Sequence, residues 1–270
     1  MRACYLDLDG TLLGRGGSLL HDGEGHVSLL GVRAIEACLR AEVEVVLMSG
    51  RRRANVAEIA RLFGQSAFIF EAGCVLSVDG EEHWLTGELT PGELTVHEQI
   101  SASGAPELLL EAYTGRLEYH EPWSAEREVS HLFRGLVDAQ EADQLLASHG
   151  HADLRLVDNG AVSRHSPALA ALPHLRGYHL IPAGGSKAAA VELHMRARGL
   201  DPVSTFAVGD SREDLAVART VGTFWLVANA LRVDDTLRET LGAFDNARVA
   251  QAPHGEGVYE AVMTTLAERR

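Results

Sequence analysis

The segment from Ala3 to Leu13 constrains the fold and the chemistry of this chain more than any other part of its sequence. Its apolar start, Ala3 to Leu6, predicts a buried parallel strand, and this strand is followed at once by Asp7-Leu8-Asp9-Gly10-Thr11. Residues two apart in a strand point to the same side, so Asp7 and Asp9 face one site unless the chain turns between them. Because two neighbouring carboxylates repel each other, a divalent cation is the group that best stabilises them at the end of a strand.

The two residues after Asp9 suit the binding of an anion. Gly10 allows the chain to turn and to come close to a ligand. Thr11 offers a hydroxyl group and a backbone N–H group to an anion. Taken alone, Asp-x-Asp is also consistent with an ordinary acidic turn after a strand, but the full sequence Asp-x-Asp-Gly-Thr-Leu favours a functional site.

The composition excludes some classes of partner. The chain has 270 residues, enough for one large or two moderate domains, and a hydrophobic content of 46%, enough for a sizeable core. A formal net charge of −14 disfavours nucleic acids and anionic membranes as partners. An anionic substrate would therefore need local positive charge from a metal ion, a lysine or an arginine.

The cysteines and the apolar runs indicate the cellular location of the protein. Cys4, Cys38 and Cys74 lie in or beside apolar runs without the spacing of metal ligands, which predicts buried free thiols in a reducing cytoplasm. The sequence shows no signal peptide and no apolar run long enough to span a bilayer. We therefore expect a cytoplasmic protein without a membrane partner.

The first third of the chain alternates between helical and strand patterns. Apolar residues recur at helical spacing from Leu29 to Ala41, and the run from Val43 to Met48 predicts a buried strand. A predicted helix from Arg53 to Phe63 and a short predicted strand from Ala67 to Phe70 follow. This order predicts an α/β fold with a Rossmann-like parallel sheet flanked by helices.

Ser49 and Gly50 come directly after the strand predicted from Val43 to Met48. Ligands of open α/β sheets bind at the carboxyl ends of the strands, where a serine hydroxyl next to a glycine can hold a phosphate oxygen. The alternative for Ser49 is a cap on the helix that follows.

Two later segments bring charged residues to the same edge of the sheet. Lys187 opens a helix predicted from Ala188 to Arg198, and an ammonium group there can neutralise a nucleophile and a phosphoryl group; a solvated lysine is the alternative. The strand predicted from Ser204 to Val208 is followed by Gly209 and Asp210, so another strand-end carboxylate joins this edge.

Together these segments resemble the four motifs of the haloacid dehalogenase superfamily of phosphohydrolases, over residues 3–80 and 184–266. The resemblance implies that Asp7 is the nucleophile, that Asp9 is the general acid/base, and that Lys187 takes part in catalysis. It assigns phosphate binding to Thr11, Ser49, Gly50, Lys187 and Asn229.

The resemblance also implies a Mg²⁺ site. The implied ligands are Asp7, the backbone carbonyl of Asp9, and Asp210, with Asp214 as a ligand or a carboxylate just behind the ligands. Two positions depart from the family pattern: Glu213 stands where the family has Asn, and Ala72 replaces an Asn near the substrate. The role of Glu213 is left open, and none is assigned to Ala72.

Residues 81–183 carry none of these motifs and are predicted to form an inserted α/β cap domain, preceded by a β-hairpin with a turn at Asp79-Gly80. The catalytic core then consists of residues 1–80 and 184–270. By position and size the insert resembles the cap of the Cof-type, sucrose-phosphatase and mannosyl-3-phosphoglycerate-phosphatase branch. Arg134, on a predicted cap strand, is a candidate contact for the distal end of the substrate, with a surface salt bridge as the alternative.

The predicted function is Mg²⁺-dependent hydrolysis of a small phosphate monoester through an aspartyl-phosphate intermediate. The resemblance implies a sugar phosphate or a phosphoglycerate-type glycoside as substrate. A phosphosugar mutase of the same superfamily would also use both aspartates, and a catalytically weak phospho-metabolite sensor is the alternative from another class. The expected partner is a small phosphorylated metabolite, and the expected state is a monomer or a homodimer.

Overall fold

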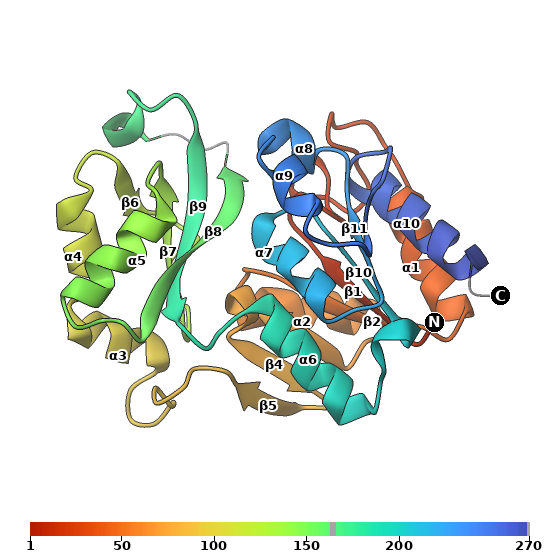
Figure 1. Cartoon of the computed structure of the whole chain (residues 1–270), viewed down its shortest axis with the longest axis horizontal. Helices are drawn as coiled ribbons and strands as arrows, with labels where there is room; N and C mark the ends of the chain where they lie inside the picture. Colours follow the sequence, from red (N-terminus) through yellow and green to blue (C-terminus); the bar gives the residue numbers. More distant parts are fainter. Residues whose placement is uncertain (163–165, 269–270) are drawn as a thin grey trace.

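The computed structural model describes residues 1–162 and 166–268 and contains two β-sheets (Figure 1). The larger sheet has eight strands in the order β12-β11-β10-β1-β2-β3-β4-β5. Its strands are β1 (Ala3–Asp7), β2 (Glu44–Met48), β3 (Ala67–Phe70), β4 (Val75–Val78), β5 (Glu81–Trp84), β10 (Thr205–Gly209), β11 (Thr223–Leu226) and β12 (Ala247–Val249). Neighbouring strands from β12 to β3 are parallel, whereas β4 and β5 pair antiparallel.

Helices cover both faces of the larger sheet (Figure 1). One buried apolar cluster includes residues of α1 (Leu30–Arg40), α2 (Arg53–Leu62) and α10 (His254–Glu268). The other includes residues of α6 (Lys187–Arg198), α7 (Arg212–Leu215), α8 (Ala230–Val233) and α9 (Leu237–Leu241). Strand β1 contributes Cys4 and Leu6 to the first cluster and Ala3 and Tyr5 to the second, as expected for a strand buried on both faces. The predicted α/β class is confirmed.

The register of three neighbouring strands brings their carboxyl ends together. Asp7 of β1 lies opposite Met48 of β2, and Leu6 of β1 lies opposite Val208 of β10. The residues that follow β2 and β10, Ser49 and Asp210, therefore reach the same edge of the sheet as Asp7.

The segment between β5 and α6, residues 85–183, is called the insert. It forms a four-stranded antiparallel sheet in the order β6-β7-β9-β8. Its elements are α3 (Val96–Ser103), α4 (Ala105–Ala112), β6 (Leu117–Tyr119), β7 (His131–Gly135), α5 (Ala139–Ser148), β8 (Leu154–Val162) and β9 (Leu175–Pro182). The edge strand β8 lies next to α7 (Figure 1). The buried cluster that contains α1 continues into the insert through Val129 and Phe133.

The predicted hairpin precedes the insert. Strands β4 and β5 are joined by Asp79 and Gly80, whose φ angles of 52° and 89° are those a type I′ turn requires. Because β5 belongs to the larger sheet, the insert starts after residue 84, a few residues later than the predicted start at residue 81. The division into a catalytic core and a cap domain stays a proposal.

Two other sequence features are placed by the structure. Cys4, Cys38 and Cys74 are free and buried, as predicted. Among the helices of the described residues, none combines the length and the apolar character needed to cross a bilayer.

Candidate active site

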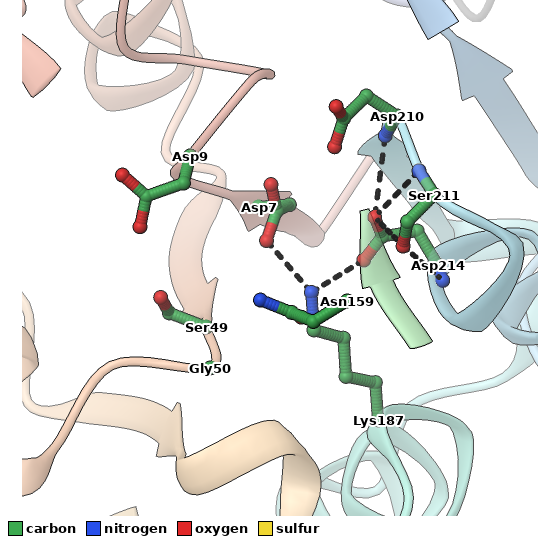
Figure 2. Close-up of a pocket in the computed structure, with 9 residues that line it drawn as sticks. All are labelled: Asp7, Asp9, Ser49, Gly50, Asn159, Lys187, Asp210, Ser211 and Asp214. Atoms are coloured by element: carbon green, nitrogen blue, oxygen red, sulfur yellow. Dashed lines mark hydrogen bonds and ion pairs between the residues drawn. The ribbon is translucent and has the colours of Figure 1, made fainter. Parts of the chain in front are cut away.

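A small pocket lies where the carboxyl ends of β1, β2 and β10 meet the start of α6 and strand β8 (Figure 2). Its lining consists of Asp7, Asp9, Ser49, Gly50, Asn159, Lys187, Asp210, Ser211 and Asp214. The sequence predicts all of them as site residues except Asn159 and Ser211. The parallel sheet therefore brings together side chains that are up to 207 residues apart in the chain, because 214 − 7 = 207.

Lys187 is the single lysine of the sequence, and its ammonium group is buried between two carboxylates. Its Nζ donates to Asp7 Oδ1 at 2.7 Å and to Asp214 Oδ1 at 2.6 Å. Lys187 is the first residue of α6, and the preceding Ser186 caps this helix, which fixes the direction of the lysine stem. Burial alone would lower the pKa of Lys187, but Asp214 and Asp7 outweigh burial and raise it, so the ammonium stays charged. The alternative of a solvated lysine does not hold.

Asp7 is the last residue of β1, and only 4% of its surface is exposed. Burial raises the pKa of its carboxyl to about 7, even though Lys187 acts in the opposite direction. Its Oδ2 is buried and has no hydrogen-bond partner among the described residues. A buried polar atom without a partner is costly, so Oδ2 marks a place for a cation or for a reacting atom.

The loop after β10 is held in place by Asp214. The Oδ2 atom of Asp214 accepts hydrogen bonds from the Ser211 hydroxyl at 2.6 Å and from the backbone N–H groups of Ser211 and Asp210 at 3.0 and 3.2 Å. Ser211 and Asp214 form a capping box at the start of α7. Thr11 Oγ1 donates to Asp210 Oδ1 at 3.3 Å, which links this loop to the segment after β1.

Asp7, Asp210 and Asp214 form a cluster that suits a divalent cation. One carboxylate oxygen from each residue lies within 4.8 Å of the others. Burial raises the pKa of Asp210 as well, and the nearby Asp7 and Asp214 raise it further, so ionisation of the cluster is unfavourable unless a cation compensates the negative charge. Carboxylate oxygens are the ligands that Mg²⁺ prefers. Both oxygens of Asp214 already accept hydrogen bonds, so Asp7 and Asp210 are better placed for direct coordination.

Asp9 lies at the rim of the pocket, because β1 ends at Asp7 and the chain turns after it. Its carboxylate forms a bidentate ion pair with Arg51, whose Nε and Nη2 atoms are each 2.6 Å from an Asp9 oxygen. The Asp9 side chain is 51% exposed and points away from Lys187 (Figure 2). The carboxylate cluster at Asp7 therefore does not include the side chain of Asp9, and the ligand implied at this position is the backbone carbonyl.

Ser49 and Gly50 form the floor of the pocket at the end of β2. The buried Ser49 hydroxyl accepts a hydrogen bond from the backbone N–H of Arg51 at 3.2 Å and lines the pocket. Gly50 lies directly against the insert. A Cβ atom at this position would be 2.7 Å from His179 Nε2 and 2.9 Å from Asn159 Nδ2. Only glycine therefore fits under the insert at this point.

We expect Gly50→Ala to lower kcat/KM for phosphate esters at least about tenfold and to cost about 1–3 kcal/mol of stability, as overpacking of a filled site does. His179 is buried and its Nδ1 lies 3.2 Å from the Ser130 hydroxyl, so the ring cannot simply move aside. Steady-state kinetics measures the change in kcat/KM, and thermal unfolding measures the change in stability. Gly92→Ala is the matched control, because a Cβ atom there meets nothing within 4 Å. Equal effects of the two substitutions would contradict close contact at Gly50.

Three residues that the sequence predicts as phosphate or substrate contacts do not line the pocket. Thr11 is buried and bonded to Asp210, beside the pocket. The Asn229 amide donates to the Gly10 carbonyl at 2.8 Å and accepts from the His254 N–H at 2.9 Å, so it braces the loop after β1. Arg134 of β7 pairs with Glu118 at 2.7 Å and is not among the residues that line the pocket. Arg134 is thus in a buried salt bridge within the insert, and its role as a substrate contact stays a prediction.

Glu71 is a buried carboxylate that joins the insert to the larger sheet. It follows β3 and accepts hydrogen bonds of 2.6–3.1 Å from the backbone N–H groups of residues 128–130 and from the Ser130 hydroxyl. Several N–H donors are what makes a buried carboxylate tolerable. Nearby in the insert, Arg127 donates to the Gly50 carbonyl at 3.0 Å. The floor of the pocket is therefore held from the insert as well as from β2.

Glu213 makes a second contact between the insert and the core. Arg155 of β8 places its Nη2 3.1 Å from Glu213 Oε1 and 2.6 Å from the Gly185 carbonyl oxygen. Glu213 directly precedes Asp214 in α7. An asparagine, the residue of the family pattern, could not form this ion pair. The negative charge of Glu213, whose role the sequence leaves open, is thus paired with the guanidinium of Arg155 from the insert.

Sequence reasoning misses Asn159 and Ser211 in the pocket, and Glu71 and Arg127 behind it. Asp158-Asn159-Gly160 has the composition of a turn, and this signal could have drawn attention to the segment. Glu71 and Arg127 have no comparable local signal, because they meet the pocket only through the packing of the insert on the core.

No family model matches the chain. Its fold matches solved structures of haloacid dehalogenase-like hydrolases, so the chain has the fold that the sequence motifs imply. One is a haloacid dehalogenase-like hydrolase from B. subtilis, with a TM-score of 0.60, 19% identity and coverage of 97% of this chain and 99% of the other. Another is the sucrose-phosphatase from Synechocystis sp. PCC6803 in complex with sucrose and phosphate, with a TM-score of 0.64, 16% identity and 98% of each chain covered.

Curated relatives resemble the chain over nearly its whole length. It is 26% identical to a phosphoglycolate phosphatase of Methanothermobacter thermautotrophicus, with 97% of each chain covered. It is 27% identical to a phosphoglycolate phosphatase of Archaeoglobus fulgidus, with 97% of this chain and 95% of the relative covered. The enzyme class predicted from the sequence, a phosphoric monoester hydrolase, is the class that both names describe.

Proposed function

We propose that this protein is a phosphatase that hydrolyses a small phosphate monoester through an aspartyl-phosphate. The observation that carries the proposal is the state of Asp7. One of its oxygens is held by the Lys187 ammonium, and the other has no hydrogen-bond partner among the described residues and lies in a pocket beside Asp210. Such a carboxylate is fixed in direction and available for reaction. The phosphatase names of the curated relatives support the same class.

The proposed reaction has two steps that use both aspartates. In the first, a carboxylate oxygen of Asp7 forms a bond to phosphorus while the bond to the leaving oxygen breaks, and Asp9 gives that oxygen a proton. In the second, water forms a bond to phosphorus, Asp9 takes the water proton, and the bond between Asp7 and phosphorus breaks. The net reaction converts ester and water into alcohol and inorganic phosphate. The bidentate ion pair with Arg51 holds the Asp9 side chain in place at the rim of the pocket.

Other residues of the pocket supply positive charge and hydrogen bonds to the phosphate. Lys187 stabilises the Asp7 carboxylate and a phosphate oxygen, the Ser49 hydroxyl binds another oxygen, and Thr11 positions Asp210 through its hydrogen bond. A bound Mg²⁺, held by Asp7 and Asp210, with Asp214 behind them and the Asp9 carbonyl as the other implied ligand, would neutralise phosphate charge.

A compact substrate of the 2-phosphoglycolate type fits best. This is the substrate that the names of the curated relatives give. A sugar phosphate is the second candidate, because a sucrose-phosphatase has the same fold. The insert would act as a cap that selects the substrate. The free cysteines favour a cytoplasmic location.

The test measures phosphate release from 2-phosphoglycolate, a hexose phosphate and an aryl phosphate, in Mg²⁺ and in excess chelator. We expect release in Mg²⁺, loss of activity in chelator and recovery when Mg²⁺ is restored, because the carboxylate cluster then regains its counter-charge. Full activity in chelator would rule out the metal-dependent reaction. Binding of the esters without release would favour the sensor. Exchange of label between a bisphosphate and a monophosphate would favour the mutase.

A further inference from the structure

Strand β8 of the insert carries a β-bulge beside the pocket. Asp158 pairs with Tyr178 of β9 and Ala161 pairs with Arg176, so Asn159 and Gly160 together stand opposite one residue of β9. Gly160 has a φ of 95°, which favours glycine. Bulges next to active sites commonly re-aim a side chain.

The bulge is anchored by its first residue. One oxygen of the Asp158 carboxylate accepts a hydrogen bond from the Gly160 N–H at 2.9 Å. The other oxygen pairs with the Arg176 guanidinium of β9. These two contacts fix the backbone on both sides of Asn159, so its side chain starts from a defined position.

The Asn159 side chain enters the pocket from the insert. Of the described residues that line the pocket, it alone belongs to the insert. Its amide lies against Gly50, because a Cβ atom on Gly50 would be 2.9 Å from Asn159 Nδ2, and Figure 2 shows it on the side of Ser49 and Gly50. Among the described residues, none makes a hydrogen bond to this amide. It therefore has both a donor and an acceptor for a ligand.

We propose that Asn159 determines substrate specificity by binding an oxygen on the carbon next to the phosphate-bearing carbon. The inference rests on the proposed phosphatase function and names the substrate class. In the proposed reaction Lys187 and Ser49 bind the phosphate from the core, so an amide that reaches the pocket from the insert meets the leaving group. An amide donates to a carboxylate and both donates to and accepts from a hydroxyl, so either oxygen fits.

Three esters with the same two-carbon skeleton test this: 2-phosphoglycolate, 2-hydroxyethyl phosphate and ethyl phosphate. We expect the wild-type protein to prefer the first two over ethyl phosphate by about tenfold in kcat/KM, the size of one satisfied hydrogen bond. Asn159→Ala should remove this preference, because kcat/KM for the two esters with the additional oxygen should fall more than kcat/KM for ethyl phosphate. Asn159→Asp should lower kcat/KM for 2-phosphoglycolate most, because two carboxylates then face each other.

Asn55→Ala, an exposed position on α2, is the matched control and should leave all three values unchanged. Thermal unfolding of each variant separates a folding defect from a change in preference. If Asn159→Ala lowered the three esters equally, or left the preference intact, the specificity role would be wrong while the phosphatase function stood. If the wild-type protein released phosphate from none of the esters, the function and the inference would both be wrong.

Discussion

Asp7→Asn is expected to abolish phosphate release and to leave a folded protein. An amide is too weak a nucleophile to form the covalent intermediate, and loss of a covalent nucleophile costs at least about hundredfold in rate. Phosphate release from 2-phosphoglycolate and from an aryl phosphate measures the loss, and circular dichroism confirms the fold. Residual activity above about one hundredth of wild type would refute the assignment of Asp7 as the nucleophile.

The same substitution is expected to raise the melting temperature in chelator at pH 8. The pKa of Asp7 is about 7 in the folded protein and about 3.9 in an unfolded chain. Its contribution to stability is thus fully present below about pH 4 and is lost as the pH rises to about 7, where the carboxyl must ionise while buried. Asn has no such loss, so its advantage should grow across this pH range. In Mg²⁺ the order should reverse, since only the wild-type cluster gains from binding.

Lys187→Met should destabilise the protein by about 3–5 kcal/mol and abolish activity. Removing one partner of a buried ion pair leaves the other charge uncompensated, and here Asp7 and Asp214 both lose their cation. Lys187→Arg should also be inactive although it keeps the positive charge, because a planar guanidinium does not fit the place of a compact ammonium. Chemical denaturation and phosphate release measure the two effects.

Two control variants separate the charge effect from the loss of packing. Arg196→Met removes a cation from the same helix, but this side chain is 66% exposed and should cost at most about 1 kcal/mol. Lys187→Met combined with Asp214→Asn removes a carboxylate together with the cation and should regain part of the stability without activity. If Lys187→Met cost no more than Arg196→Met, the buried ion pairs would not be important for stability.

The sequence predicts those parts of the site that follow from the parallel sheet. Asp7, Ser49 and Asp210 each come at or just after the end of a strand, and adjacent parallel strands place such residues at one edge. Lys187 is predicted because it opens the helix that follows the insert. The hairpin at Asp79-Gly80 and the apolar face of α1 follow from local patterns, whereas the order of the strands in the sheet comes from the structure.

The directions of individual side chains are harder to predict. The i, i+2 rule applies only within a strand, and β1 ends at Asp7, so the Asp9 side chain meets Arg51 instead of Lys187. Arg134 is proposed as a substrate contact from its residue type, yet Glu118 on the neighbouring strand pairs with it. Asn159 depends on a bulge, which Asp158 and Gly160 favour locally, and on the packing of the insert against Gly50, which no local pattern gives.

Because Lys187 is the single lysine, a lysine-specific protease can cleave this chain at one place. An endoproteinase that cleaves only after lysine has one target bond, between Lys187 and Ala188, and yields fragments 1–187 and 188–270. That bond lies in the first turn of α6, and the lysine that the protease must bind is 1% exposed and held by two carboxylates. Cleavage therefore requires this turn to unfold and both ion pairs to separate. The rate at which the two fragments appear measures how often the active site opens, at one bond and without any label.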